Sequence, residues 1–378
     1  MAASPRPFPP QGRGRRSYRV MLTTDAVGGV WRQTLELAAG LTAGGTQVLL
    51  AILGPRPNAA QRAEAASLNG CDTTITDLPL DWTADSAEDL RRAGCTLASI
   101  AVDWDADTIQ LHAPALVADV DWPAPVVTMA HSCVGTWWRA VRGGDLPPEL
   151  AWRAECTRRG LLAADAVLAP SRSFAAELAA FYGLQRPVQV VTNGARSMQV
   201  QRSKRSHALT AGRLWDEGKN IGMLDAAAGL SSVPVRAAGP ISGPNGAAVA
   251  PRNLRLLGTL GAAGLACEYA RAAVFVSVAR YEPFGLAVLE AAQAGCALLL
   301  SDIPSFRELW DGAALFVDAS DPIRIADALR ALVAEPTRCD QLGTVAREQS
   351  RRYGPEAMIA GTWAVHRELL ADRAMAAA

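Results

Sequence analysis

The sequence predicts an α/β protein made of two doubly wound domains in tandem. Short apolar runs bounded by Pro, Gly or Asp alternate with segments of helical spacing along the chain, which favours parallel sheets covered by helices on both faces. The alternation forms two series, separated by a polar and basic stretch. A length of 378 residues also suits two domains, because one domain commonly has about 100–200 residues.

The first series begins with a strand over 19–23, a tight turn at Gly28-Gly29 and a helix over 31–41. Further short runs, bounded by turn residues, predict strands over 48–53, 73–76, 108–111, 126–130, 166–169 and 188–191. We therefore expect a Rossmann-like domain over 18–195. The preceding residues 1–17 are rich in Pro, Gly and Arg and lack the apolar core of a secretion signal, so they are interpreted as a disordered tail.

The stretch 196–206 has no apolar pattern and is interpreted as a linker. The second series predicts strands over 208–211, 233–237, 254–257, 274–278, 297–300 and 314–317. Its main helices are expected over 220–228, 264–272, 284–294 and 322–334. The second Rossmann-like domain thus spans 207–354, and a C-terminal helix follows within 355–378. The sequence leaves open whether this helix crosses back to the first domain.

Composition excludes several classes of protein. Lys+Arg and Asp+Glu are equal at 37 each, which argues against broad nucleic-acid binding. The sequence has no charge-free apolar run of about 18 residues, so we expect no membrane span. Seven scattered cysteines without a CxxC motif suggest neither a disulfide framework nor a zinc site. A cytoplasmic protein without a bound metal fits this usage.

The segment from Glu282 to Glu290 is the strongest functional signal. It follows a predicted strand and opens a predicted helix, and free N–H groups at a helix start bind anions. Gly285 allows a ligand to approach the backbone closely. Two carboxylates beside an anion site suit a ligand that has both phosphates and hydroxyls. A nucleotide sugar is such a ligand, although the E-x7-E spacing alone also fits an ordinary connection with two solvated glutamates.

A basic pair follows the first strand of the second domain. Arg213 and Lys219 leave the strand end in the segment Gly-Arg-Leu-Trp-Asp-Glu-Gly-Lys, and ligands of such sheets bind at the carboxyl ends of strands. We expect both cations at the same crevice as the Glu282 segment. Arg offers a planar fork to phosphate oxygens and Lys offers a point charge. A solvated loop that pairs with Asp216 and Glu217 is the simpler alternative.

Taken together, these motifs resemble the retaining glycosyltransferases of the two-Rossmann GT-B fold, in the family 4-like group that includes bacterial glycogen and sucrose synthases and mannosyltransferases. The resemblance covers nearly all of the chain after residue 18. It includes Gly28-Gly29, Val-Thr-Met-Ala-His over 127–131, the runs 165–171 and 190–194, Gly212-Arg213 with Lys219, and the Glu282 segment. It implies transfer of a sugar from a nucleotide-sugar co-substrate, with no cofactor and no metal.

The resemblance also assigns roles to residues of the second domain. Arg213 and Lys219 would bind the donor diphosphate and stabilise the leaving nucleotide. Glu282 would hold sugar hydroxyls, and Glu290 would bind the ribose hydroxyls. Backbone amides would contact the diphosphate or the sugar, contributed by Phe284, Gly285 and Leu286.

In the first domain, the resemblance implies that Gly28 and Gly29 let the backbone approach the donor phosphate. His131 would contact a hydroxyl of the transferred sugar. His112 follows a similar strand and is the weaker candidate, whereas His207 and His366 are interpreted as surface residues. The shared cleft between the domains is the expected site. The leaving diphosphate would take the acceptor proton with retention at the anomeric carbon, so no side-chain nucleophile is expected.

Two other features have simpler interpretations. The run Asp103-Trp-Asp-Ala-Asp107 contains a D-x-D pattern but precedes a strand, so it is interpreted as a polar turn. A Trp- and Arg-rich stretch over 137–159 suits an acceptor site or a transient contact with an anionic membrane surface, and equally a buried Trp face with solvated Arg. The alternatives left open for function are a nucleotide-sugar epimerase of the same architecture and a catalytically silent nucleotide-sugar-binding subunit. The sugar, nucleobase, acceptor and oligomeric state are not determined by the sequence.

Overall fold

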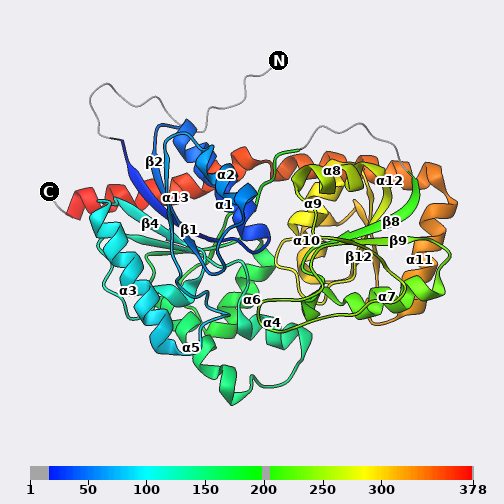
Figure 1. Cartoon of the computed structure of the whole chain (residues 1–378), viewed down its shortest axis with the longest axis horizontal. Helices are drawn as coiled ribbons and strands as arrows, with labels where there is room; N and C mark the ends of the chain where they lie inside the picture. The colour runs from blue at the N-terminus through cyan, green and yellow to red at the C-terminus, as the bar shows by residue number, and fades with distance from the viewer. Residues whose placement is uncertain (1–16, 198–204, 377–378) are drawn as a thin grey trace. The chain divides into compact units, whose positions relative to one another are not determined.

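The computed structural model describes residues 17–197 and 205–376, drawn in Figure 1. These residues divide into two compact units. The first comprises the described residues up to Thr136, Gly144–Gly194 and the described residues from Pro355 on. The second comprises Trp137–Gly143 and the described residues of Ala195–Gly354. The predicted tail lies outside the described residues except for Ser17, as does most of the predicted linker.

The first unit is built on a seven-stranded parallel sheet in the order β3-β2-β1-β4-β5-β6-β7. Its strands are β1 (Arg19–Asp25), β2 (Gln47–Leu53), β3 (Cys71–Ile75), β4 (Thr108–Leu111), β5 (Val126–Met129), β6 (Ala166–Ala169) and β7 (Gln189–Val190). The strand order reverses between β1 and β4, where Val20 pairs with Val48 on one side and with Thr108 on the other. Such a switch point places a crevice at the carboxyl ends of the central strands.

Helices and one short 3-10 segment connect these strands. They are α1 (Gly29–Ala43), α2 (Ala59–Ala66), α3 (Ala87–Asp103), η1 (Pro114–Val117), α4 (Val134–Val141), α5 (Pro148–Ala163) and α6 (Arg172–Tyr182), with the C-terminal α13 (Pro355–Ala376). Successive β1 residues serve opposite cores, because side chains alternate along a strand. Val20 and Leu22 pack with α1 and α13, whereas Met21 packs in the cluster that includes α3 residues.

The C-terminal helix α13 belongs to the first unit. Met358 and Ile359 are buried in the core that contains β1 and α1. Gly40 of α1 permits this packing, because a Cβ there would overlap the Ile359 side chain. The C-terminal helix therefore crosses back to the first unit, which the sequence left open. The contact that decides this joins segments about 320 positions apart.

The second unit has a six-stranded parallel sheet in the order β10-β9-β8-β11-β12-β13. Its strands are β8 (Arg205–Ala211), β9 (Val235–Ala238), β10 (Arg255–Gly258), β11 (Ala272–Ser277), β12 (Ala297–Ser301) and β13 (Ala314–Val317). Its helical segments are η2 (Glu217–Lys219), α7 (Ile221–Leu230), α8 (Ala262–Arg271), α9 (Leu286–Gln293), α10 (Pro304–Trp310), α11 (Pro322–Ala334), α12 (Pro336–Ser350) and η3 (Arg351–Tyr353). Here the strand order reverses between β8 and β11.

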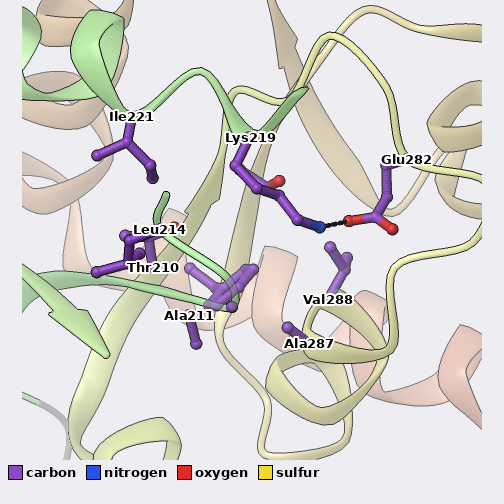
Figure 2. A pocket seen from close by; sticks show the side chains of 11 residues that line it. Thr210, Ala211, Leu214, Lys219, Ile221, Glu282, Ala287 and Val288 are labelled. Carbon is purple, nitrogen blue, oxygen red and sulfur yellow. Dashed lines mark hydrogen bonds and ion pairs between the residues drawn. The ribbon is translucent and has the colours of Figure 1, made fainter. Parts of the chain in front are cut away.

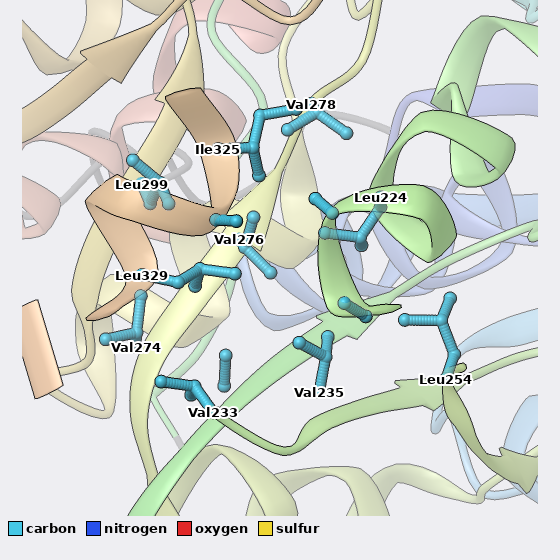
Figure 3. Packing of buried hydrophobic residues seen from close by; sticks show 14 of the residues in the cluster. Leu224, Val233, Val235, Leu254, Val274, Val276, Val278, Leu299, Ile325 and Leu329 are labelled. Atoms are coloured by element: carbon cyan, nitrogen blue, oxygen red, sulfur yellow. The ribbon is translucent and has the colours of Figure 1, made fainter. Parts of the chain in front are cut away.

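The central strand β11 is buried on both faces. Val274 and Val276 point to a core shared with Leu224 of α7 and Ile325 of α11, as Figure 3 shows. Phe275 points to the opposite core, which α9 helps to close. A strand that is buried on both faces has a continuous run of apolar residues in the sequence. For this reason the position of β11 is predictable from the sequence.

The predicted α/β class and every predicted strand are confirmed, with boundaries that differ by at most three residues. The largest difference is β8, which begins at Arg205 inside the predicted linker. The interpretation of His207 and His366 as surface residues is wrong: both are buried. Each lies in an element that packs on neighbouring strands or helices. The burial of a single histidine in such an element cannot be predicted from its residue type. Across the described residues no helix combines the length and apolarity needed to cross a membrane.

Candidate active site

A pocket opens at the carboxyl ends of β8 and β11 in the second unit. Figure 2 shows Lys219 and Glu282 facing each other across it. Strand residues, the loop after β8 and the first turn of α9 form its walls, namely Thr210, Ala211, Gly212, Leu214, Lys219, Ile221, Phe275, Ser277, Glu282, Ala287 and Val288. The pocket therefore lies at the switch point of the sheet, where α/β proteins bind ligands.

Lys219 and Glu282 form an ion pair inside this pocket. Their side chains are 21% and 16% exposed, so both charges are largely withdrawn from water. In the absence of a charged ligand, the Lys219 ammonium and the Glu282 carboxylate compensate each other's charge. A phosphate brought to Lys219 competes with Glu282 for the ammonium, and Glu282 is then available to accept hydrogen bonds from hydroxyls.

Asn220 holds the loop that carries Lys219. It adopts the left-handed conformation (φ 58°), which Asn tolerates better than most residues. Its buried side-chain amide donates to the carbonyl of Val278 at 3.1 Å and to that of Ala319 at 3.0 Å. These bonds tie the loop to the segments that follow β11 and β13. The sequence analysis missed this residue, and its one available signal was an Asn directly before a helix.

Arg213 lies on the same loop as Lys219 but does not line the pocket. Its guanidinium donates to the Asp216 carboxylate at 3.0 Å and lies 5.6 Å from the Trp215 ring centroid. Asp216 in turn accepts from the backbone N–H of Gly218 at 2.9 Å. The structure therefore brings Lys219 together with Glu282 and leaves Arg213 paired with Asp216. The Arg213–Asp216 pair is one part of the solvated-loop alternative, whereas Lys219 is largely buried.

The first turn of α9 forms one wall of the pocket. Gly285 precedes the helix at φ 89° and ψ 67°, and no side chain caps the helix start. The predicted helix began at 284, whereas α9 begins at Leu286 because the left-handed Gly285 interrupts the helical backbone. Uncapped N–H groups and the positive end of the helix dipole favour an anion here. Phe284 is buried and packs edge-on against Tyr353, and this contact anchors the turn that contains Gly285.

Glu290 lies one helical turn into α9. Its carboxylate accepts a hydrogen bond of 3.1 Å from the hydroxyl of Tyr269. Tyr269 is buried, so it holds Glu290 in place.

In the first unit, Gly28-Gly29 follow β1, His112 follows β4 and His131 comes two residues after the end of β5. The three strands are neighbours in the sheet, so these residues gather at one edge. Gly28 has φ 93°, a conformation that side chains disfavour. Val27 N–H donates to the Asp25 carboxylate at 2.6 Å and tightens the turn.

His112 and His131 contact each other directly. His112 Nδ1 lies 2.7 Å from His131 Nε2, and the two ring planes are nearly parallel, at 7°, with centroids 5.0 Å apart. Burial lowers the pKa of His131 to about 4 and also lowers that of His112, to which the neighbouring histidines contribute. Both rings are therefore neutral near pH 7, and each acts as a hydrogen-bonding group rather than a charge.

The two remaining sequence features form contacts within the fold. The carboxylate of Asp107 accepts from the N–H of Arg19 at 2.8 Å, so the D-x-D run closes the amino end of the sheet. The described residues contain no group of His, Cys, Asp and Glu with metal-binding geometry. In the Trp- and Arg-rich stretch, Arg158 pairs with Glu155 at 2.7 Å and the Arg153 guanidinium lies 4.4 Å from the Trp152 ring centroid.

Comparisons with known protein families match both halves of the chain. Residues 27–196 match the model described as Glycosyltransferase Family 4, and residues 248–349 match the model described as Glycosyl transferases group 1. The second match contains Glu282, Gly285 and Glu290. No curated protein matches the sequence significantly.

Several solved structures share the fold. A sucrose-phosphate synthase from Thermosynechococcus elongatus has a TM-score of 0.74 at 18% identity, covering 94% of this chain and 100% of that chain. The Anabaena protein HepE, in complex with UDP and glucose, has a TM-score of 0.68 at 13% identity, covering 93% and 100%. A glycosyltransferase from Rickettsia africae has a TM-score of 0.67 at 13% identity, covering 94% and 99%. At these identities the likeness is one of fold.

Proposed function

Because the chain is a glycosyltransferase family 4-like protein of the GT-B type, we propose that it transfers a sugar from a nucleotide diphosphate donor to an acceptor, with retention at the anomeric carbon. The observation that carries the donor proposal is the pocket of Lys219, Glu282 and the uncapped start of α9. It offers one cation, free backbone N–H groups and a carboxylate within a single pocket. These groups match the phosphates and hydroxyls of a nucleotide sugar.

The donor diphosphate is assigned to Lys219, the first turn of α9 and Arg213, which would exchange Asp216 for a phosphate. Glu282 would leave Lys219 and accept hydrogen bonds from sugar hydroxyls. Glu290, held by Tyr269, is assigned to the ribose hydroxyls. The fold shared with HepE, a structure that contains UDP and glucose, supports this class of ligand.

In the reaction, the bond between the anomeric carbon and the leaving phosphate oxygen breaks. The acceptor hydroxyl oxygen bonds to the same face of that carbon, and its proton passes to the leaving diphosphate. Lys219 and the α9 amides stabilise the charge that grows on the diphosphate, and preorganised electrostatics of this kind commonly contributes most to catalysis. This route uses no side-chain nucleophile, no metal and no cofactor. His131, with Gly28 and Gly29, is assigned to the transferred sugar and the donor phosphate.

A panel of nucleotide sugars, read by thermal shift, tests the proposal. A bound donor stabilises the fold by mass action, by about 2.7 kcal/mol at a hundredfold excess over its dissociation constant. The stabilising donor is then incubated with candidate acceptors, and NMR reads the anomeric configuration of the product. An isomerised donor without acceptor would instead support an epimerase, binding without turnover would support a silent subunit, and no binding by any donor would refute the proposal.

A further inference from the structure

A chain of polar side chains runs through the interior of the first unit and ends at His131. Thr108, Gln110 and His112 share one face of β4 and its continuation, because alternate residues of a strand point the same way. His366 reaches this face from α13. Thr108, Gln110 and His366 are fully buried. Buried polar groups are costly unless they are hydrogen-bonded, so each of these side chains needs a partner inside the unit.

Every link of this chain is at hydrogen-bonding distance. Thr108 Oγ1 lies 3.0 Å from His366 Nδ1, and His366 Nε2 lies 2.9 Å from Gln110 Oε1. Gln110 Nε2 lies 3.3 Å from His112 Nε2. His112 Nδ1 lies 2.7 Å from His131 Nε2. Each neutral imidazole in the chain has one nitrogen that donates and one that accepts.

The amide of Gln110 sets the direction of the protons. Its Oε1 only accepts, so His366 carries its proton on Nε2. His366 Nδ1 is then an acceptor, and it shares the single proton of the Thr108 hydroxyl with the Pro125 carbonyl, which lies 3.1 Å from that hydroxyl. Its Nε2 only donates, so His112 is unprotonated at Nε2 and protonated at Nδ1. His112 Nδ1–H then donates to His131 Nε2, which leaves the proton of His131 on Nδ1.

His131 Nδ1 is the free end of the chain. Within residues 17–197 and 205–376 it has no hydrogen-bond partner, and the His131 ring is only half-buried. We propose that His366, acting through Gln110 and His112, is a positioning residue that fixes the tautomer of His131, so that its Nδ1–H is presented to a ligand as a donor. The role of that ligand rests on the proposed function, whereas the tautomer itself does not.

Only four histidines occur in the chain, so NMR can assign each ring from single variants. Long-range proton–nitrogen correlation on the full chain with nitrogen-labelled histidine reports which ring nitrogen carries the proton. We expect Nδ1–H at His131 in the unaltered protein. His366→Phe keeps a ring in place but removes both bonds, and we expect His131 to become a mixture of tautomers. His366→Gln keeps a donor for Gln110 and should restore the single tautomer.

A matched control separates coupling from lost packing. Ile359→Ala removes buried apolar contacts on the same helix without touching the chain of polar groups, so it should lower stability and leave the His131 tautomer unchanged. If His366→Phe fails to fold, Gln110→Met interrupts the chain of hydrogen bonds at its middle with little change in side-chain volume. The tautomer of His131 in that variant is measured by the same NMR experiment. An unaltered protein protonated at His131 Nε2, or an unchanged tautomer in the broken variant, overturns the inference.

Turnover gives an independent readout. Loss of one well-directed hydrogen bond to the substrate corresponds to about a fivefold effect, and we expect it in the donor KM of His366→Phe with rescue in His366→Gln. Equal kinetics in all three proteins would overturn the link to the substrate. A protein that transfers no sugar at all would refute the proposed function, while the NMR result would still decide the coupling.

Discussion

Lys219 and Glu282 neutralise each other inside the pocket at the carboxyl ends of β8 and β11. They come from the loops after two neighbouring strands, 63 positions apart in the sequence. The two opposite charges of the pair balance each other inside the pocket. Its separation by a ligand that offers phosphates to one partner and hydroxyls to the other is the central element of the proposed donor site.

Replacement of Lys219 tests this element. We expect Lys219→Ala to lower kcat/KM by about 10²- to 10³-fold, the range found when one group that stabilises developing charge is removed. Steady-state kinetics with the donor found by thermal shift provides the measurement. Arg307→Ala is the control, because Arg307 forms an exposed pair with Asp302 in the same unit and its loss should leave turnover unchanged. Unchanged turnover in Lys219→Ala would refute the assignment.

The Tyr269–Glu290 contact gives a test of the ribose assignment. Glu290→Ala should raise the donor KM by about 10- to 100-fold, because hydrogen bonds to a charged group are worth about 1.5–3 kcal/mol. Tyr269→Phe should have a smaller effect, about fivefold, since it removes one neutral donor. A donor that lacks a ribose hydroxyl should bind Glu290→Ala and the unaltered protein with similar affinity, because the hydrogen bond to that hydroxyl is absent from both complexes. If the loss of affinity from Glu290→Ala and the loss from the missing hydroxyl add fully, Glu290 does not contact the ribose.

Gly285 tests the geometry of the α9 start. A Cβ at this position would lie 3.2 Å from Phe306 and Val288 and 3.3 Å from Glu282, in a backbone with φ 89°. We expect Gly285→Ala to cost more than the roughly 1–2 kcal/mol of left-handed strain alone and to weaken donor binding by moving Glu282. Gly312→Ala is the control, because Gly312 also has positive φ (77°) but open space around it. Urea unfolding measures both, and equal costs would contradict the packing argument.

Acid should destabilise the first unit through His366. Burial lowers the pKa of His366 from 6.5 to about 4, so between these values the unfolded chain binds a proton that the folded chain does not. The contribution of His366 to the free energy of unfolding is therefore complete above pH 6.5. This contribution falls by roughly 3 kcal/mol as the pH drops to 4. The groups that face its ring are Thr108, Gln110 and Trp363, all uncharged, and His112 is a titratable group that interacts with it electrostatically.

Urea unfolding at several pH values measures this slope. His366→Gln has no titrating ring at this position and should show a shallower fall of stability between pH 6.5 and 4. The slope that remains belongs to the other titrating groups, including His112 and His131, whose pKa values burial also lowers. An identical slope in both proteins would contradict the assignment to His366.

The strands and the pocket segment were predictable because their signals are local. The apolar run of β11 and the Gly-Arg to Lys219 loop each occupy a short window, and the order of elements follows from their alternation. The pairing of Arg213 with Asp216, rather than a place in the pocket wall, depends on loop geometry. Asn220 was missed since its two partners, at Val278 and Ala319, lie 58 and 99 positions away.

The sequence by itself determined the α/β class, the two series of strands and the Glu282–Glu290 segment, because hydrophobic periodicity and turn residues act over a few positions. Only the tertiary structure decided that α13 packs on α1 and that His366 is buried beside Thr108, 258 positions away. A single polar residue has no pattern that reveals its burial. Its environment is set by which elements pack together, and its partners are selected by the need to satisfy every buried polar group.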